Sequence, residues 1–460
     1  MNKRILSLAL PNIVTNITVP LLGIVDMAVV GHLSVAHIGA ITIGASIFNL
    51  IYWNCGFLRM GTSGFTAQAF GAGDREEQCR LLVRALSVAW MIALLLIVLQ
   101  YPVSLLACAI FDGGDEVMQM AMTYFFIRIW AAPATLGNYA VKGWFIGMQN
   151  SRLPMWIAIM LNIVNIVCSL LFVLVLRWNI AGVAWGTVIA QYCGLFVGLW
   201  FIYRRYGDLF RSYGRVGETR HASFSMLLRD ALHLDAMKVF FKVNADIFLR
   251  TVCLSLVFTF ITAASGRISD SVLAIDALLL QFFTLFSYIM DGFAYAGESL
   301  VGRYIGARDG GKLRSAVRLL LVWGMALTLF FTLLYALFNE PFLHIFASDE
   351  TLIAATRQYL FWVLIIPVCG FAAFLFDGIF IGATASRVMR DSMFVATFSF
   401  FAVFYGGRWL LGYVAKDVAL TEFEQNNILW AAFMVFLLLR GVLQWLALRR
   451  AVYGQVPAVC

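Results

Sequence analysis

The chain has 460 residues, of which 62% are hydrophobic, 15% aromatic and only 13% charged. Soluble domains carry about 25% charged residues, so this composition excludes an ordinary soluble protein and predicts an all-α polytopic membrane protein. The net charge of +8 could suggest nucleic-acid binding, but the basic residues gather in the short segments between apolar runs. We therefore expect the lipid bilayer as its surroundings and no nucleic-acid partner.

A helix that crosses a bilayer needs about 20 mainly apolar residues, and the sequence divides into twelve such runs. In chain order the predicted spans are 8–32, 38–60, 84–108, 118–146, 154–176, 180–203, 240–264, 272–298, 316–338, 353–380, 390–414 and 428–448. Most of the 33 Lys and Arg residues fall in alternate connecting segments, which the positive-inside rule assigns to the cytoplasm. We expect both termini to be cytoplasmic in a bacterial inner (plasma) membrane.

Other chemistries find no support in the sequence. The eight cysteines include no C-x-x-C pair and the five histidines show no i, i+4 pairing, so we expect no metal site and no cofactor. GARDGGKL (306–313) resembles a phosphate-binding loop, but Leu313 replaces the hydroxyl residue that would bind magnesium. We therefore predict that the protein binds no nucleotide. No Ser/His/Asp set falls at a suitable depth in the spans, so we also predict that the protein is not an enzyme.

The two halves of the sequence resemble each other. GFLRMGTSGFTAQAFGAGD (56–74) is similar to GFAYAGESLVGRYIGARD (292–309), and GWFIGMQNSR (143–152) is similar to GIFIGATASR (378–387). Both copies end equivalent spans, so the halves have the same orientation, as in transporters whose lobes are related by a pseudo-two-fold axis along the membrane normal. The predicted parts are an N-terminal lobe of six helices (1–203), a cytoplasmic linker with an interfacial helix (204–239), a C-terminal lobe of six helices (240–449) and a cytoplasmic tail (450–460).

Asp26 lies within an otherwise apolar run of the first predicted span, LLGIVDMAVVGHL (21–33). At 100° per residue it shares a helix face with Asn12, Asn16 and Gly23. An ionised Asp facing lipid would cost about 2.5 to 3.5 kcal/mol, so this face must look toward protein or water. Burial favours the neutral form of a carboxyl group, which lets it exchange protons near neutral pH. A structural hydrogen bond or ion pair is the alternative role for Asp26.

Polar residues of two further spans match this face of the first span. The fifth span presents Asn162, Asn165 and Ser169 on one side, and the sixth presents Thr187 and Gln191. The predicted polar pocket around Asp26 consists of Asn12, Asn16, Asn165, Ser169, Thr187 and Gln191. Two prolines of the first span, Pro11 and Pro20, each remove a backbone donor, so this helix is the one best able to bend.

Five segments together resemble the multidrug and toxic compound extrusion (MATE) family, in particular its DinF-like branch, over essentially the whole chain. They are LPNIVTNITVPLLGIVDMAVVGHL (10–33), FLRMGTSGFTAQAFGAGD (57–74), NADIFLR (244–250), DGFAYAGES (291–299) and DGIFIGATASRVMRDSM (377–393). The resemblance implies a secondary active antiporter that exports amphipathic, often cationic organic compounds by alternating access in exchange for protons or sodium ions. It also implies that Asp26 is the coupling acid.

One departure from the family bears on the coupling ion. Many members have a second aspartate four residues after the asparagine that corresponds to Asn165, where this sequence has Ser169. With one carboxyl group in the pocket we expect proton coupling, because sodium prefers several hard oxygen ligands; sodium coupling stays an alternative. A lipid-linked precursor flippase of related architecture is another, although it would favour a large cationic cavity. We expect a small amphipathic organic substrate and a monomer.

The second half carries more charge within its spans than the first. Asp246 and Arg250 have the i, i+4 spacing of a local ion pair. Asp291 and Glu298 share a face of the eighth span, and Asp377 is expected near the inner membrane surface, within reach of water. These five residues are secondary candidates for gating or ion binding.

Overall fold

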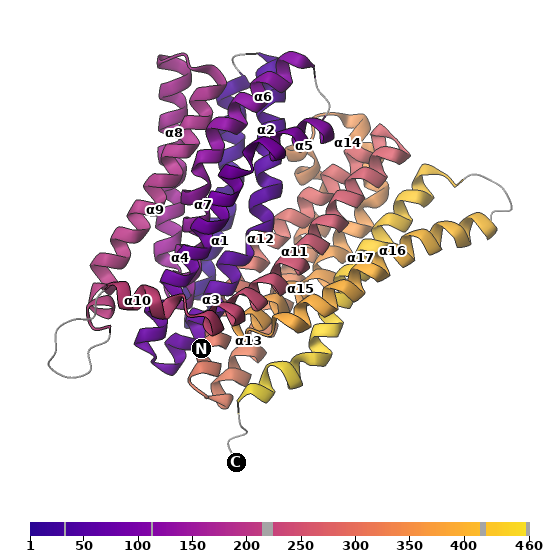
Figure 1. Cartoon of the computed structure of the whole chain (residues 1–460). Coiled ribbons are helices and arrows are strands. Elements are labelled where there is room, and N and C mark those ends of the chain that lie inside the picture. Colours follow the sequence, from indigo (N-terminus) through magenta and orange to yellow (C-terminus); the bar gives the residue numbers. More distant parts are fainter. Residues whose placement is uncertain (32–33, 112–113, 214–223, 415–419, 457–460) are drawn as a thin grey trace. The chain divides into compact units, whose positions relative to one another are not determined.

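The computed structural model describes residues 1–31, 34–111, 114–213, 224–414 and 420–456, except for the side chains of 19–22, 24–31, 35, 224 and 414 (Figure 1). The secondary structure of these residues is helical throughout, without strands. The chain divides into two compact units. The N-terminal unit is Leu10–Asn244, and the C-terminal unit combines Met1–Ala9 with Ala245–Cys460.

The N-terminal unit contains most of α1, all of α2 to α10 and the beginning of α11. The helices are α1 (Asn2–Gly31), α2 (Val35–Asn54), α3 (Phe57–Ala72), α4 (Arg75–Val98), α5 (Gln100–Ile110), α6 (Asp115–Arg128), η1 (Ile129–Ala131), α7 (Ala132–Gly147), α8 (Arg152–Leu170), η2 (Leu171–Val175), α9 (Asn179–Arg211), α10 (Phe224–Ala231) and α11 (Leu234–Ile268). The core packs α3 and α4 against α7, and α8 against α9 (Figure 1).

Glycine allows the closest of these contacts, that of α3 with α7. A Cβ atom on Gly143 would lie 2.4 Å from the backbone oxygen of Arg59, and one on Gly147 would lie 2.8 Å from that of Ser63. The turn between α3 and α4 is equally determined by its residues. Gly73 has a left-handed φ of 71°, and Asp74 caps α4 by accepting a hydrogen bond from the amide of Glu77 at 2.9 Å.

The C-terminal unit contains the first residues of α1, the rest of α11 and the helices that follow. These are α12 (Asp270–Gly306), α13 (Gly310–Phe346), α14 (Glu350–Thr356), η3 (Arg357–Tyr359), α15 (Leu360–Gly382), α16 (Ser386–Val414), α17 (Glu422–Ala451) and η4 (Tyr453–Gln455). In the core α15 packs against α12, α13 and α17. The long helix α13 loses helical geometry at Phe338 (φ −123°), three residues before Pro341, whose ring and missing amide disrupt the preceding turn.

Close contact and turn geometry in the C-terminal unit again depend on single residues. A Cβ atom on Gly378 would lie 2.1 Å from the backbone oxygen of Ala294, and one on Gly382 would lie 2.6 Å from that of Glu298. Arg308 has a left-handed φ of 52° between α12 and α13. Asp309 caps α13 by accepting a hydrogen bond from the amide of Lys312 at 2.9 Å.

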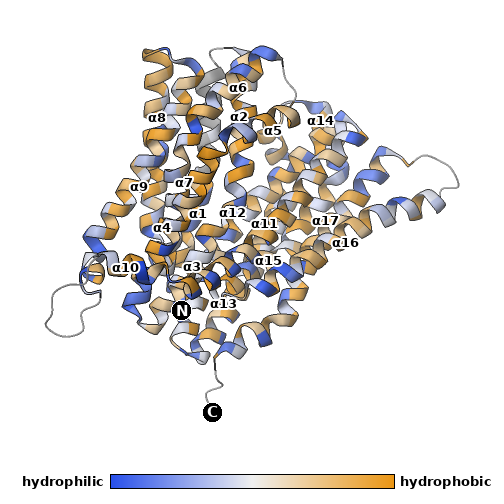
Figure 2. Ribbon diagram, in the orientation of Figure 1, coloured by the Kyte–Doolittle hydropathy of each residue, from blue (hydrophilic) through white to orange (hydrophobic). Residues whose placement is uncertain are grey.

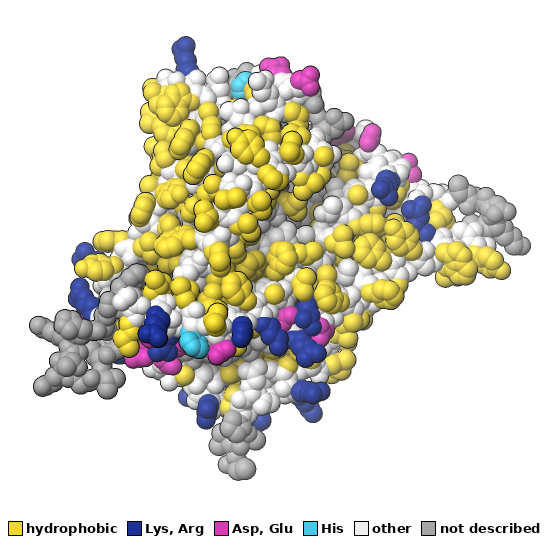
Figure 3. Space-filling model, in the orientation of Figure 1, with side chains coloured by type: hydrophobic (Ala, Val, Ile, Leu, Met, Phe, Trp, Pro, Cys, Tyr) yellow, Lys and Arg dark blue, Asp and Glu magenta, His cyan; other side chains and the backbone are white. Residues whose placement is uncertain are grey.

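Ten helical segments among the described residues are long and apolar enough to cross a membrane. Figure 2 shows hydrophobic residues along much of the length of these helices. Large hydrophobic side chains such as Leu337, Ile345 and Phe398 are 73 to 76% exposed, as expected for residues that face lipid. Hydrophobic side chains cover much of the face in Figure 3, and Lys and Arg side chains gather toward one end of the helices. The protein is therefore a multi-pass membrane protein.

Several helix boundaries differ from the predicted spans. The predicted span 38–60 is interrupted at Cys55 and Gly56, where α2 ends and α3 begins, and 84–108 is divided between α4 and α5. The segment predicted as a linker (204–239) is also more helical than a connecting loop. It includes the last turns of α9, all of α10 and the beginning of α11.

Candidate functional site

A buried polar contact joins α8 to α9 in the N-terminal unit. The side-chain amide of Asn165 donates to the hydroxyl oxygen of Thr187 at 3.0 Å, and that hydroxyl donates to the carbonyl of Val183 at 3.1 Å. Asn165 and Ser169 are fully buried and Thr187 is 1% exposed. The structure therefore brings together Asn165 of the fifth predicted span and Thr187 of the sixth, and it buries Ser169 on the same helix as Asn165.

Two oxygen atoms of this contact region have unused hydrogen-bonding capacity. Asn165 Oδ1 and Ser169 Oγ are buried and have no hydrogen-bond partner in the described part of the chain. Asn165 and Ser169 are four residues apart, so they lie one above the other on the same side of α8. Buried polar atoms without partners are uncommon in folded proteins and call for an explanation such as a functional role. We name Asn165, Ser169 and Thr187 the α8–α9 polar pocket.

Helix α1 contacts α8 through side-chain amides at two levels. Asn12 donates to the Ser151 hydroxyl at 3.0 Å, and Asn162 donates to the backbone carbonyl of Thr18 at 2.8 Å. Residue numbers rise along both helices from the first contact to the second, so α1 and α8 run in the same direction. The hydroxyl of Thr15 donates to the carbonyl of Pro11 at 2.9 Å.

The other predicted pocket residues fall into different groups. No hydrogen bond joins Gln191 to Asn165 in the described part of the chain; the side-chain and backbone oxygens of Gln191 accept hydrogen bonds from Asn138 of α7 at 3.1 and 2.9 Å. Asn16 is half-buried and has interactions of its own. The side chains of Asp26 and Pro20 lie outside the described residues, although both positions belong to α1.

The C-terminal unit contains a buried ion-pair network centred on Asp377. Its Oδ2 accepts hydrogen bonds from the guanidinium groups of Arg250 and Arg440, the latter at 2.7 Å, and its Oδ1 accepts from Gln444 at 3.0 Å. Asp377 and Arg250 are each 6% exposed and Arg440 is 2% exposed. The expectation that Asp377 reaches water near the membrane surface is therefore wrong, because two cations hold it inside the helix bundle.

The predicted local pair of Asp246 with Arg250 is wrong as well. Asp246 accepts hydrogen bonds from Ser386 at 2.9 Å and from Arg390 at 2.7 Å, while Arg250 turns to Asp377. The i, i+4 spacing brings two side chains to one helix face, but contacts with α15 and α16 determine their partners here.

Two further predicted acids of α12 are present in the C-terminal unit. Glu298 is 1% exposed, and Asp291 is half-buried with its carboxylate in electrostatic contact with Arg440. The described residues include no group of three or more His, Cys, Asp or Glu side chains arranged to hold a metal ion.

One buried acid was not predicted from the sequence: Asp276 of α12, which is 1% exposed. It accepts hydrogen bonds from Ser265 of α11, and from Asn426 at 2.9 Å and Trp430 at 2.7 Å on α17. The signal was present as an isolated acid seven residues into an apolar helix. Its three neutral donors lie on distant segments and could not be paired with it from the sequence.

The fold and the buried polar contacts define the class first: a polytopic α-helical membrane protein with polar groups in the interior of each unit. Comparison with known proteins then identifies the family. The family model MatE matches residues 11–171 and 247–406, and the chain belongs to this family. It is 36% identical over 442 residues to the DNA damage-inducible protein F of Escherichia coli (strain K12), with 96% of this chain and 90% of that protein covered.

Solved structures share the fold at low sequence identity. A crystal structure of MATE in the bent conformation superposes with a TM-score of 0.80 at 17% identity, covering 99% of this chain and 96% of the other. A multidrug resistance MATE family transporter of the MOP superfamily, in its outward-facing conformation, superposes with a TM-score of 0.76 at 18% identity, covering 98% and 96%.

Proposed function

We propose that the protein is a secondary active antiporter that exports small amphipathic, often cationic organic compounds in exchange for protons, with Asp26 as the coupling acid. Membership of the MatE family supports a transporter, and one of the structures that share its fold is described as a multidrug resistance transporter. The observation that carries the coupling proposal is the α8–α9 polar pocket, where Asn165 Oδ1 and Ser169 Oγ are buried without partners in the described part of the chain.

The register of α1 against α8 supports a role for Asp26 beside this pocket. Thr18 of α1 is level with Asn162 of α8, and Asp26 follows Thr18 by eight residues, or about 12 Å along a helix. Because α1 and α8 run in the same direction, the same rise from Asn162 leads to Leu170, the residue after Ser169. The coupling acid and the two unpartnered oxygen atoms would then occupy the same part of the unit.

Protonation changes what an acid at this level can do. An ionised carboxylate only accepts hydrogen bonds, whereas a protonated carboxyl group also donates one. Asn165 Oδ1 is an acceptor without a donor, and the Ser169 hydroxyl can donate or accept. A protonated Asp26 would donate its one O–H to Asn165 Oδ1, accept from the Ser169 hydroxyl and draw α1 toward α8. Bending near Pro11 or Pro20 would accompany this step. One pH unit provides about 1.4 kcal/mol per proton, comparable to the few kcal/mol that separate typical conformers.

Two acids of the C-terminal unit are already paired with cations, which weighs against sodium binding at either of them. Asp377 already pairs with Arg250 and Arg440, and Asp246 pairs with Arg390. A carboxylate whose negative charge is neutralised by guanidinium groups is a poor ligand for a sodium ion. A flippase for lipid-linked precursors would need a large cationic cavity, and the α8–α9 polar pocket consists of neutral groups.

Turn geometry supports the proposed architecture of two parallel six-helix lobes with twelve membrane-spanning helices. Left-handed residues occur at Gly73 and Arg308, and again at Gln149 and Thr384, at positions that correspond between the repeated motifs. The close glycine contacts of Gly143 and Gly378 correspond in the same way. Such a repeat gives both halves the same orientation, which agrees with cytoplasmic termini in a bacterial inner membrane.

Transport into proteoliposomes under imposed gradients tests the proposal. The purified protein is expected to accumulate a fluorescent organic cation against its concentration gradient when only a proton gradient is present. Replacing sodium by potassium at constant pH should leave the rate unchanged. Strict dependence on a sodium gradient would contradict proton coupling, and no uphill transport under either gradient would contradict an antiporter.

A further inference from the structure

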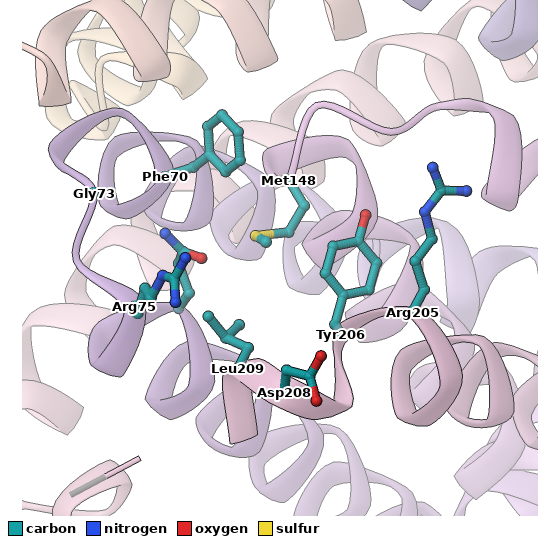
Figure 4. A pocket seen from close by; sticks show the side chains of 9 residues that line it. Phe70, Gly73, Arg75, Met148, Arg205, Tyr206, Asp208 and Leu209 are labelled. Atoms are coloured by element: carbon teal, nitrogen blue, oxygen red, sulfur yellow. The ribbon is translucent and has the colours of Figure 1, made fainter. Parts of the chain in front are cut away.

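A cavity of about 360 Å³ opens at one end of the helices of the N-terminal unit (Figure 4). It lies between the turn that joins α3 to α4, the residue after α7 and the last turns of α9. Phe70, Met148 and Leu209 form an apolar part of its lining, and Arg75 and Arg205 stand on opposite sides of the opening. The cavity is separate from the α8–α9 polar pocket, because no residue belongs to both.

The two arginines of this cavity have no acidic partner among the described residues. Within the described part of the chain, neither Arg75 nor Arg205 forms an ion pair, whereas Arg80 and Arg211 nearby do. Asp208 also lines the cavity, but its carboxylate is held by Arg211 at 3.6 Å. Two guanidinium groups with free donors therefore border the cavity, and an anion at its opening could bind them.

The residues around the cavity indicate the depth at which it opens. Trp200 and Tyr203 of α9 are 49% and 68% exposed, and they lie five and two residues before Arg205. Trp and Tyr concentrate where the bilayer meets water. The Arg204 guanidinium carbon lies 5.5 Å from the centroid of the Trp200 ring, so this positive charge is held beside the exposed Trp200 side chain. An anion in this cavity would be at the height of lipid headgroups.

An open cavity is not a necessary result of this fold. In the repeat proposed above, Ala383 of the C-terminal unit corresponds to Met148. There the side-chain amide of Gln455 donates to the Ala383 carbonyl at 2.9 Å, and Val456 is buried, so the chain itself occupies this place. The N-terminal unit leaves the equivalent space open and borders it with arginines.

We propose that this cavity binds the phosphate headgroup of an anionic phospholipid. Arg75 and Arg205 hold the phosphate by charge-assisted hydrogen bonds, and Phe70, Met148 and Leu209 contact the glycerol and the beginning of the acyl chains. A free phosphate compound would use the arginines equally well, but it would gain nothing from the apolar part of the lining or from the position beside Trp200 and Tyr203.

Native mass spectrometry of the full-length protein, titrated with dioleoyl-phosphatidylglycerol or dioleoyl-phosphatidylcholine, tests this proposal. The wild type is expected to prefer phosphatidylglycerol. The double variant Arg75→Gln/Arg205→Gln should bind it about thirtyfold more weakly, since each basic residue contributes about 1 kcal/mol toward anionic lipid. Arg449→Gln/Arg450→Gln removes two adjacent exposed charges at the end of α17 and should leave binding within about twofold of wild type.

Two further measurements separate the cavity from general surface charge and from soluble phosphate. Asp208→Asn removes the one acid of the lining at a fully accessible position and should strengthen phosphatidylglycerol binding. Millimolar inorganic phosphate should not displace the lipid. Wild-type affinity in Arg75→Gln/Arg205→Gln, equal loss in the Arg449/Arg450 control, no gain in Asp208→Asn, or complete displacement by inorganic phosphate would each overturn the proposal.

Discussion

Asn165 of α8 and Thr187 of α9 form a buried hydrogen bond of 3.0 Å in which the amide donates to the hydroxyl. Thr187→Val keeps the shape of the side chain but leaves the Asn165 amide without its acceptor. We expect the free energy of unfolding in detergent to fall by about 1 to 3 kcal/mol. The matched control is Thr262→Val. The Thr262 hydroxyl is at an exposed position and donates to the Phe258 carbonyl of its own helix. Equal destabilisation by both substitutions would show that the interhelical bond contributes nothing.

Glycine at two corresponding positions sets the approach of neighbouring helices. Gly143→Ala and Gly378→Ala would place a methyl group 2.4 and 2.1 Å from a backbone oxygen, so both should lower the melting temperature strongly. A methyl group on Gly406 of α16 would instead meet no atom within 4 Å. Gly406→Ala should stabilise by about 0.5 to 1 kcal/mol, since alanine is the better helix former. Melting curves of the three variants test whether the change in melting temperature is negative for Gly143→Ala and Gly378→Ala and positive for Gly406→Ala. A Gly378→Ala variant as stable as the wild type would contradict the packing described.

The Asp377 network predicts an asymmetric response to substitution. Asp377→Asn leaves the guanidinium groups of Arg250 and Arg440 buried with no carboxylate between them. We expect a loss of about 3 to 5 kcal/mol, as when one partner of a buried ion pair is removed. Glu340→Gln breaks an exposed pair with Arg357 and should change the melting temperature little. Similar melting temperatures for the two variants would argue against a buried network.

Tyr213, just beyond α9, predicts a pH dependence. Its hydroxyl donates to Asp230 at 2.7 Å and accepts from Arg80 at 3.0 Å. Burial raises the pKa of this hydroxyl above its ordinary value of 10.0, Arg80 opposes the rise and Asp230 adds to it. Because the pKa is higher in the folded state, the stabilisation is complete below that ordinary value and is lost as pH rises through the folded pKa.

Tyrosinate absorbance measures this titration directly. The difference between wild type and Tyr213→Phe should appear only above pH 10, the ordinary value. Asp230→Asn should move it to lower pH, because the neutral amide no longer raises the pKa. A Tyr213 signal that titrates below the ordinary value would refute the contact with Asp230.

Much of the fold could be predicted from the sequence. Hydrophobic runs of spanning length predicted the membrane helices, and the spacing of polar residues predicted which helix faces are buried. The 3.6-residue period put Asn165 and Ser169 on one face of their helix, and the structure then shows Thr187 of α9 hydrogen-bonded to Asn165. Helix boundaries were less accurate. The break at Gly56 divides a continuous apolar stretch, and nothing in its hydropathy marks the interruption.

The charged residues of the C-terminal unit could not be paired from the sequence. Arg250 and Asp377 are 127 residues apart, and the third member, Arg440, lies in yet another helix. Local spacing favoured Asp246 as the partner of Arg250, but packing of α15 and α17 around α11 decided otherwise. Asp276 was missed for the same reason, since its donors come from α11 and α17.

The coupling role of Asp26 is the central claim, and Asp26→Asn in proteoliposomes tests it most directly. Uphill transport of the organic cation driven by a proton gradient should be lost, and proton release on addition of substrate should disappear, since the amide cannot titrate. Substrate binding should persist, and Asp115→Asn at the exposed beginning of α6 should behave as wild type. Uphill transport at the wild-type rate by Asp26→Asn would contradict the account.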